Sequence, residues 1–313
     1  MLRKRIGITL GDPRGIGPEV TDKALRHPEL RDAADFVLIG PEGMVRGNSG
    51  RSVGRWAPGG TPAEAGRLAG EAIRCGVEMA LCGEVDALVT APIEKSAFRA
   101  GGWDYPGHTE MLGELTGSRA VGMMMSADRT ALGGSLRVVL ATTHIALRDV
   151  ASAVTSDLLV EQALLTRDAL SSWWGVERPR LALGALNPHA SDGGLFGDEE
   201  CRVFGPALAR LRGLAVDVVG PLPADTVFGR AIRGEFDAVI APYHDVGMAA
   251  FKTVAFGGGV NVTLGLPFPR TSPDHGTAMD IAGRGIADPT SMVEAITLAI
   301  RLAPHFDSPS PRK

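Results

Sequence analysis

Short apolar runs alternate with longer amphipathic stretches along most of the chain. The short runs predict buried strands, and stretches with an apolar residue at roughly every third to fifth position predict helices. The predicted strands are 5–10, 35–40, 86–91, 121–126, 137–144, 180–189, 216–220, 237–244 and 260–264. The predicted helices cover 62–82, 155–174, 198–212 and 224–233, with further helices starting near Pro18, Pro92 and His108.

This alternation predicts an α/β fold with a largely parallel sheet that helices cover on both faces. Residues 47–61, rich in Gly, Ser and Arg, predict a surface loop. Residues 274–303 predict one loop and two helices. We find no internal repeat and no low-complexity segment that would suggest another architecture.

Composition narrows the class of protein and its partners. A chain of 313 residues with 44% hydrophobic content suits one large or two ordinary domains. The net charge of −4 and the lack of a long basic run argue against a nucleic-acid partner. No apolar stretch approaches the roughly 20 residues of a membrane span. Three cysteines without CxxC spacing indicate reduced thiols, so we expect a cytoplasmic protein without membrane partners.

Three histidines stand in the same context, just beyond an apolar run. They are His144, His189 and His244. Parallel strands bring such positions to one edge of the sheet, which is where ligands bind in these folds. Three imidazoles suit Zn, Co, Mn, Fe or Ni, although a general base or separate structural histidines would leave the same pattern. Asp245 could orient a histidine or take a proton, and so could Asp12, or each could be an ordinary turn carboxylate.

Candidate chemistry is densest between residues 237 and 288. Lys252 and Arg270 flank the glycine run 257–259, an arrangement that suits a phosphate pocket, although surface cations would look the same. His108 could donate to an anion or cap a helix. The glycine-rich loop 11–17 could cradle an anion on its N–H groups or form a tight connection only.

Several blocks of sequence resemble the 4-phosphohydroxythreonine dehydrogenase family of pyridoxal phosphate biosynthesis. The blocks occur in order along the chain: GDPRGIGPE (11–19), APIEKSAF (91–98), GHTE (107–110), ATTHIALRD (141–149), LNPHASDGG (186–194), GPLPADT (220–226), YHD (243–245) and the stretch 257–285. Residues 274–290 also resemble the adenosine-binding loop of isopropylmalate and isocitrate dehydrogenases.

The resemblance implies a fold similar to that of isocitrate and isopropylmalate dehydrogenases. It has two α/β/α domains, mostly parallel sheet, and the active site in the cleft. The first domain would comprise residues 1–115 and 265–313 and carry the dinucleotide loop. The second, residues 116–264, would carry most metal ligands and the interface of a homodimer.

The resemblance also assigns roles to residues. The metal ligands fall on His144, His189 and His244, and His244 by its position comes from the partner chain. The substrate-binding residues fall on His108, Thr109, Lys252, Asn261 and Arg270. The cofactor-binding residues fall on His275, Gly276, Thr277, Ala278 and Asp280. We expect Asp245 and Lys252 to be catalytic, with NAD or NADP and one divalent ion (Zn, Mg, Mn or Co) as cofactors.

The reaction implied is NAD-dependent oxidation of 4-phosphooxy-L-threonine at C3 with decarboxylation to 3-amino-2-oxopropyl phosphate. Val246, the HASDGG turn and a short 45–61 region depart from the usual family pattern. They leave open a phosphorylated four-carbon acid (D-threonate or D-erythronate 4-phosphate) or an aromatic-acid dihydrodiol as substrate. From the residues alone, a metal-dependent hydrolase or phosphatase and a non-catalytic binding protein are the rival readings.

Overall fold

The computed structural model describes residues 3–45 and 50–303, and the chain divides into two compact units. Unit 1 comprises Met1–Arg119 and Val260–Lys313, and unit 2 comprises Ala120–Gly259. Compactness does not by itself show that a unit folds alone. The domain boundaries given above therefore stay a prediction.

The described part of unit 1 contains six strands and follows the predicted parallel pattern with one exception. The strands are β1 (Arg5–Thr9), β2 (Asp35–Glu42), β3 (Arg51–Arg55), β4 (Ala87–Thr90), β10 (Val260–Leu264) and β11 (Arg270–Pro273). Their order is β3-β2-β1-β4-β11-β10. Neighbours are parallel except β10 and β11, which form an antiparallel pair. The apolar strands are almost completely buried, as expected for a sheet covered on both faces.

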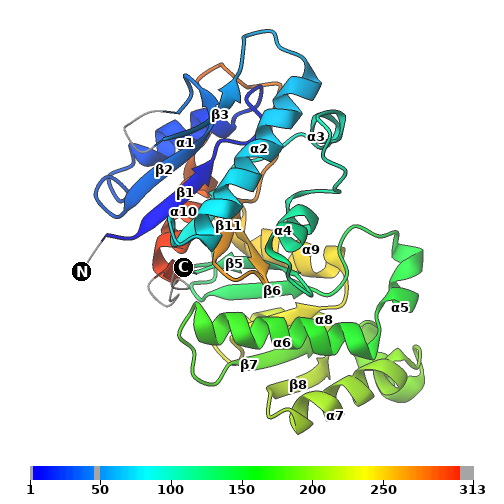
Figure 1. Ribbon diagram of the computed structural model, residues 1–313. Helices are drawn as coiled ribbons and strands as arrows, with labels where there is room; N and C mark the ends of the chain where they lie inside the picture. Colours follow the sequence, from blue (N-terminus) through cyan, green and yellow to red (C-terminus); the bar gives the residue numbers. More distant parts are fainter. Residues whose placement is uncertain (1–2, 46–49, 304–313) are drawn as a thin grey trace. The chain divides into compact units, whose positions relative to one another are not determined.

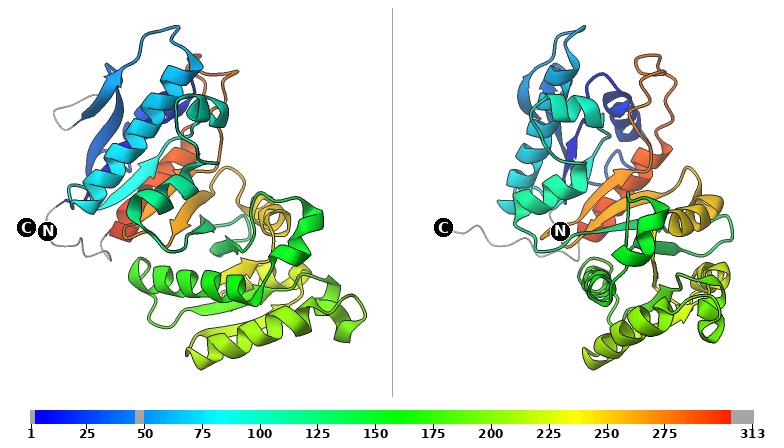
Figure 2. Two further views of the ribbon diagram at one scale, coloured as in Figure 1. Left: turned by 45° about the vertical axis from the view of Figure 1, so that its right-hand side comes forward. Right: turned by 90° about the vertical axis from the view of Figure 1, so that its right-hand side faces the viewer.

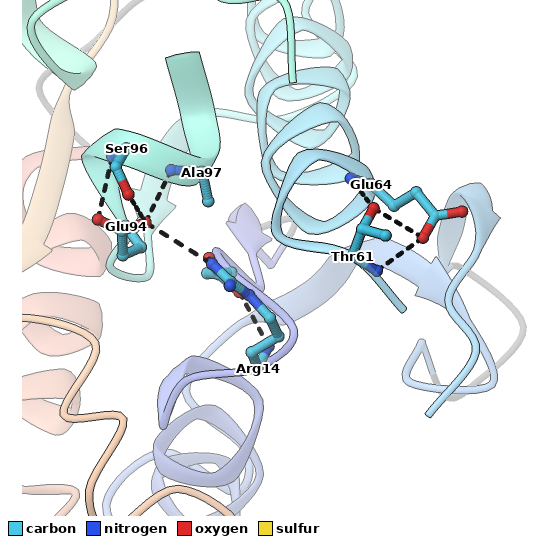
Figure 3. Close-up of polar contacts among 7 residues, drawn as sticks. Arg14, Thr61, Glu64, Glu94, Ser96 and Ala97 are labelled. Atoms are coloured by element: carbon cyan, nitrogen blue, oxygen red, sulfur yellow. Dashed lines mark hydrogen bonds and ion pairs between the residues drawn. The ribbon is translucent and has the colours of Figure 1, made fainter. Parts of the chain in front are cut away.

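Helices cover both faces of this sheet. The helices α2 (Pro62–Leu81) and α10 (Thr290–Leu302) contact its strands, while α1 (Gly17–Leu25) packs against α10, and α3 (Lys95–Ala100) and α4 (His108–Thr116) pack against α2. In Figure 2, right, β1 lies between α2 and α1. Helix α2 begins at a capping box in which the Glu64 N–H donates to Thr61 Oγ1 (3.2 Å) and the Thr61 N–H donates to Glu64 Oε2 (2.8 Å; Figure 3).

Unit 2 is built around a second, smaller set of strands (Figure 1). They are β5 (Gly122–Ala127), β6 (Leu136–Leu140), β7 (Arg180–Gly184), β8 (Asp217–Leu222) and β9 (Ala238–Ala241), in the order β5-β6-β9-β7-β8. All neighbours are parallel except β5 and β6. The core between β6, β9 and the helices α8 (Ala224–Ile232) and α9 (His244–Ala255) combines aliphatic side chains with phenylalanines, of which Phe251 is fully buried.

The remaining helices of unit 2 connect these strands. They are η1 (Leu147–Asp149), α5 (Val150–Ala153), α6 (Ser156–Ser172), the 3-10 segment η2 (Pro188–Gly194), the π-helical turn η3 (Glu200–Phe204) and α7 (Gly205–Gly213). The predicted helix near 198–212 is confirmed as two contiguous helical segments, η3 and α7, of which the first is π-helical.

The α/β class and the mostly parallel strands are confirmed, and several segments differ from the prediction. Part of 47–61 forms the strand β3. Residues 274–303 contain one α-helix, α10, and not two, because several residues before it adopt left-handed backbone angles that a helix cannot contain. Residues 270–273, which lie outside the predicted strands, form the strand β11, and Arg270 begins it. All three cysteines are unpaired, and in the described ranges no helix is long and apolar enough to span a membrane.

Candidate active site

Two of the three predicted metal ligands lie side by side in unit 2. The ring centroids of His144 and His244 are 5.6 Å apart. The pairing of β6 with β9 explains this, since Leu140 lies opposite Ala241 and both chains leave the sheet together. Backbone hydrogen bonds continue past the strand ends, from Ala141 N–H to Ala241 O (2.9 Å) and from Thr142 N–H to Pro242 O (3.2 Å). The expected convergence of strand ends is therefore present for this pair.

His244 has a carboxylate partner on its own helix. The distance from His244 Nδ1 to Asp245 Oδ1 is 2.8 Å. If Nδ1 carries the proton, it donates to this carboxylate and Nε2 becomes the acceptor, which is the tautomer that a metal requires. A small pocket of about 120 Å³ is lined by both histidines and by Asp245, together with Thr143, Ile145, Leu147, Val150 and Tyr243.

His189 occupies a different setting. It is exposed in η2, the segment that follows β7, and its φ of 52° is left-handed. Across residues 3–45 and 50–303, no group of three or more His, Cys, Asp and Glu side chains is arranged to hold a metal ion. The structure thus brings His144 and His244 together but leaves His189 apart from them. The two neighbouring imidazoles supply two donors of the kind that borderline divalent ions bind.

Unit 1 contains a buried cation at the start of β11. Arg270 is 2% exposed and donates to hydroxyl oxygens: Nε to Thr90 Oγ1 (3.1 Å) and Nη1 to Thr263 Oγ1 (2.9 Å), with Nη2 also bonded to Thr90. Burial lowers the pKa of Arg270 to about 9, so the guanidinium is still charged at pH 7. A buried charge held by neutral hydroxyls is costly, and an anion beside it would offset that cost.

Two other buried polar groups in unit 1 also lack a partner that a bound ligand could supply. His108, the first residue of α4, has a buried Nε2 without a hydrogen-bond partner, and Asn261 Oδ1 is in the same condition. Burial and then the positive charges of Arg270 and Lys95 hold the pKa of His108 well below its ordinary value. The imidazole is therefore neutral and can donate one N–H. Rotating the Asn261 amide would present Nδ2 as a further donor.

The other predicted substrate residues are less constrained. Thr109 follows His108 in the first turn of α4 and is partly exposed. Lys252 lies in α9 of unit 2, so its pairing with Arg270 stays a prediction. Sequence reasoning missed Thr90 and Thr263. The signal was available, because each is a buried hydroxyl residue in a strand whose other residues are mostly apolar.

The segment carrying the predicted cofactor residues packs against the glycine-rich loop 11–17. The N–H of Ile16 donates to Thr277 O (2.9 Å), and a Cβ added to Gly15 would lie 2.9 Å from Thr277 Cβ and from its carbonyl oxygen. A side chain at position 15 would therefore push the two loops apart. His275, Gly276, Ala278 and Asp280 all lie on this same irregular segment, in positions from partly to fully exposed.

An ion pair fixes the far end of that segment. Lys23 Nζ donates to Gly285 O (2.9 Å) and Ala287 O (2.7 Å), while the Ala287 N–H donates to Glu19 Oε1 (2.9 Å). Lys23 also donates to Glu19 (2.8 Å), and this bond, which outweighs burial, lowers the pKa of Glu19. Helix α1 thereby holds the segment by both a donor and an acceptor.

Asp12 forms its observed side-chain hydrogen bonds with Arg14, two residues along the chain. It is 1% exposed and accepts hydrogen bonds from the Arg14 N–H (2.9 Å), Nε (3.0 Å) and Nη2 (2.7 Å). Arg14 also lies 3.8 Å from Glu94, which caps α3 through Ser96 and Ala97 (Figure 3). Of the two roles considered for Asp12, the turn carboxylate fits these contacts.

Comparison with known proteins gives consistent matches over the whole chain. The family model described as pyridoxal phosphate biosynthetic protein PdxA matches residues 29–299. The chain is 42% identical to a 4-hydroxythreonine-4-phosphate dehydrogenase of Chromobacterium violaceum, covering 97% of this chain and 98% of the relative. It is 40% identical to a D-threonate 4-phosphate dehydrogenase of Salmonella typhimurium, covering 97% and 100%.

Solved structures agree. A 4-hydroxythreonine-4-phosphate dehydrogenase from Klebsiella pneumoniae superposes with a TM-score of 0.86 at 37% identity, covering 96% of this chain and 99% of that one. An isocitrate dehydrogenase from Methylococcus capsulatus superposes with a TM-score of 0.53 at 16% identity, covering 95% and 85%. The second likeness concerns the fold alone, and it confirms the predicted resemblance to the isocitrate dehydrogenase fold.

Proposed function

The chain belongs to the family of pyridoxal phosphate biosynthetic proteins PdxA, as its motifs predicted, and we propose that it oxidises 4-phosphooxy-L-threonine at C3 with NAD. The oxidised acid then loses CO2 to give 3-amino-2-oxopropyl phosphate, a step of pyridoxal phosphate biosynthesis. The observation that carries the phosphorylated substrate is Arg270, a buried guanidinium held only by neutral hydroxyls in its observed hydrogen bonds.

The substrate phosphate would bind at this cation. Charge-assisted hydrogen bonds from a guanidinium to phosphate are among the stronger polar contacts in proteins. The neutral His108 would donate its Nε2–H, and Asn261, Thr109 and Lys252 would supply further donors. Binding would thereby satisfy the buried groups on His108 and Asn261 that lack partners in this structure.

The reacting carbon would lie near the histidines of unit 2. We propose His144, His189 and His244 as ligands of one divalent ion (Zn, Mg, Mn or Co). When bound, the ion would act as a Lewis acid toward the substrate's oxygen atoms, and NAD (or NADP) would accept the hydride. Asp245 would hold His244 in the required tautomer and take up the hydroxyl proton. Lys252 would supply the proton that replaces CO2 on carbon.

The dinucleotide would bind at the segment that follows β11. His275, Gly276, Thr277, Ala278 and Asp280 are the proposed contacts. This segment is held from two sides in unit 1, by Ile16 at Thr277 and by Lys23 at Gly285 and Ala287. A segment fixed in this way needs little ordering when the cofactor binds, which favours affinity.

A second candidate substrate is the analogue with a hydroxyl in place of the C2 amine. The 40% identity to a D-threonate 4-phosphate dehydrogenase is nearly as high as the identity to the 4-hydroxythreonine-4-phosphate dehydrogenases. A phosphate site alone cannot separate the two, since both substrates carry that group. A cytoplasmic location is consistent with either and stays a proposal.

The rate of NADH formation with each candidate compound identifies the substrate. We expect turnover with 4-phosphooxy-L-threonine to exceed that with D-threonate 4-phosphate and D-erythronate 4-phosphate, and we expect a chelator to abolish it. Adding back each metal in turn identifies the ion. Faster turnover of either phosphorylated acid would replace the proposed substrate, and turnover unaffected by chelation would remove the metal.

Replacing Arg270 by Met should raise the substrate KM by about ten- to a hundred-fold or more. This corresponds to the loss of one charge-assisted contact, about 1.5–3 kcal/mol. The KM for NAD should not change, because the predicted cofactor residues lie elsewhere in unit 1. The exposed Arg99, changed to Met, is the matched control. An unchanged substrate KM in Arg270→Met would place the phosphate site elsewhere.

Replacing His144, His189 or His244 by Ala should each abolish turnover and weaken metal binding while the protein stays folded. The three side chains are partly or fully exposed and are not part of the core. Steady-state rates in metal-stripped buffer, metal titration and circular dichroism check this. His27→Ala is the control, since His27 belongs to none of the proposed sites. Any of the three variants that keeps full activity loses its assignment as a ligand.

We further propose a homodimer in which His244 of each site comes from the partner chain. Mixing inactive His144→Ala and His244→Ala subunits should then restore activity. In each mixed dimer one site carries both substitutions and the other site carries neither. Random exchange makes about half of the dimers mixed, so roughly a quarter of wild-type activity should be recovered. Differently tagged chains measure the fraction of mixed dimers.

The same experiment tests the opposite arrangement. Because His144 and His244 lie close together within one chain, a single chain could also supply both histidines of one metal site. In that case every subunit carries a lesion in its own site. Mixed dimers without recovered activity would therefore show that the site is not shared.

A further inference from the structure

The turn that carries His189 has an unusual backbone. Five consecutive residues, His189 to Gly193, have positive φ angles between 44° and 69°, and four of them are not glycine. Left-handed backbone is unfavourable for residues with a Cβ atom and normally occurs at single positions. A run of this kind persists only when surrounding contacts determine it.

A buried carboxylate supplies those contacts. Glu200, the first residue of η3, is 6% exposed and accepts four hydrogen bonds from the turn. Its Oε1 accepts from the N–H groups of Leu186 (2.9 Å) and Asn187 (2.7 Å). Its Oε2 accepts from Asn187 Nδ2 (2.9 Å) and from the hydroxyl of Ser191. These donors lie on both sides of His189 in the sequence.

The donors also keep this carboxylate ionised. Burial acts to raise the pKa of Glu200, but the hydrogen bonds from Ser191 and Asn187 outweigh it, and the pKa is lowered overall. An ionised carboxylate accepts hydrogen bonds more strongly than a neutral acid or amide does. The neighbouring Glu199 is less buried and accepts only one observed bond from the turn, from Asn187 Nδ2 (2.7 Å).

We propose that Glu200 is a positioning residue that holds the 186–191 turn in the left-handed conformation from which His189 binds the divalent ion. The inference rests on the proposed function, since it takes His189 as a ligand. Glu200 touches neither the ion nor the substrate. It acts by fixing the backbone of the ligand before the ion arrives, as groups outside the ligand shell commonly do.

Glu200→Gln tests the proposal with little change in shape. The glutamine side chain has one acceptor oxygen where the carboxylate has two. It therefore cannot accept the hydrogen bonds from the Leu186 and Asn187 N–H groups and the one from the Ser191 hydroxyl at the same time. In the metal-free full-length protein, we expect amide hydrogen exchange across 186–191 to speed up by about tenfold or more. Titration with Co²⁺, followed by its visible absorption, should give a Kd raised by about ten- to a hundred-fold. The KM for NAD should not change.

Glu199→Gln is the matched control, because it removes the same charge one residue away. It should change exchange and Co²⁺ affinity by less than about threefold. Equal losses in both variants would show that only local negative charge matters and would overturn the proposal. If Glu200→Gln fails to fold, Ser191→Ala removes one donor at a position whose neighbour Ala190 already has φ 55°. It should weaken Co²⁺ binding in the same direction, and an unchanged Kd there would also overturn the proposal.

His189→Ala in the same titration separates this inference from the function on which it rests. Weaker Co²⁺ binding in His189→Ala but not in Glu200→Gln would overturn the role of Glu200 alone. Unchanged binding in His189→Ala would remove His189 from the metal site, and the proposed positioning role would fail with it.

Discussion

The guanidinium of Arg270 is buried, and its hydrogen bonds depend on the packing of three strands of unit 1. The hydroxyl oxygens of Thr90 in β4 and Thr263 in β10 accept hydrogen bonds from Arg270 in β11. An isolated ion in the interior costs several kcal/mol even after relaxation. The antiparallel β10–β11 pair, placed beside the parallel β4, is what brings both hydroxyls to the same side chain. The packing of these three strands therefore holds a buried cation without a counter-charge. An anion bound beside it would offset the cost of burying the charge.

In unit 2 the corresponding constraint is strand register. The β6–β9 pairing aligns Leu140 with Ala241, and hydrogen bonds past the strand ends keep the two chains together. His144 and His244 then meet although 100 residues separate them, the same separation that links Thr142 to Pro242. Packing of β6 and β9 thus fixes the position of two chemically active side chains that are themselves not part of the core.

Parts of this arrangement could be predicted from the sequence and parts could not. Apolar runs gave the parallel strands, and the common position of the histidines correctly predicted that His144 and His244 converge. The separate setting of His189 could not be predicted, since periodicity carries no information about consecutive left-handed residues. Strand β11 was missed because it is short and bounded by Pro269 and Pro273, which read as a turn.

The remaining errors have similar causes. Two helices were expected within 274–303, but Ala278, Gly283 and Gly285 have positive φ angles and only α10 forms. The pairing of Lys252 with Arg270 was inferred from the glycine run that both residues flank, and it stays a prediction, since Lys252 lies in the helix α9 of unit 2 and Arg270 in unit 1. The roles of the site residues therefore depend on the family resemblance more than on local pattern.

Two buried ionic groups, Glu200 and Arg270, lead to opposite conclusions, and their hydrogen bonds explain why. Glu200 accepts from four donors of one turn, so its charge is compensated by the protein and its contribution is to hold backbone in place. Arg270 meets neutral hydroxyls, and burial depresses its pKa to about 9. A buried charge with its full set of partners stabilises structure, whereas one without a counter-charge gains most when a ligand supplies it. This difference supports the proposed roles, in which Glu200 holds the backbone around His189 and Arg270 binds the substrate phosphate.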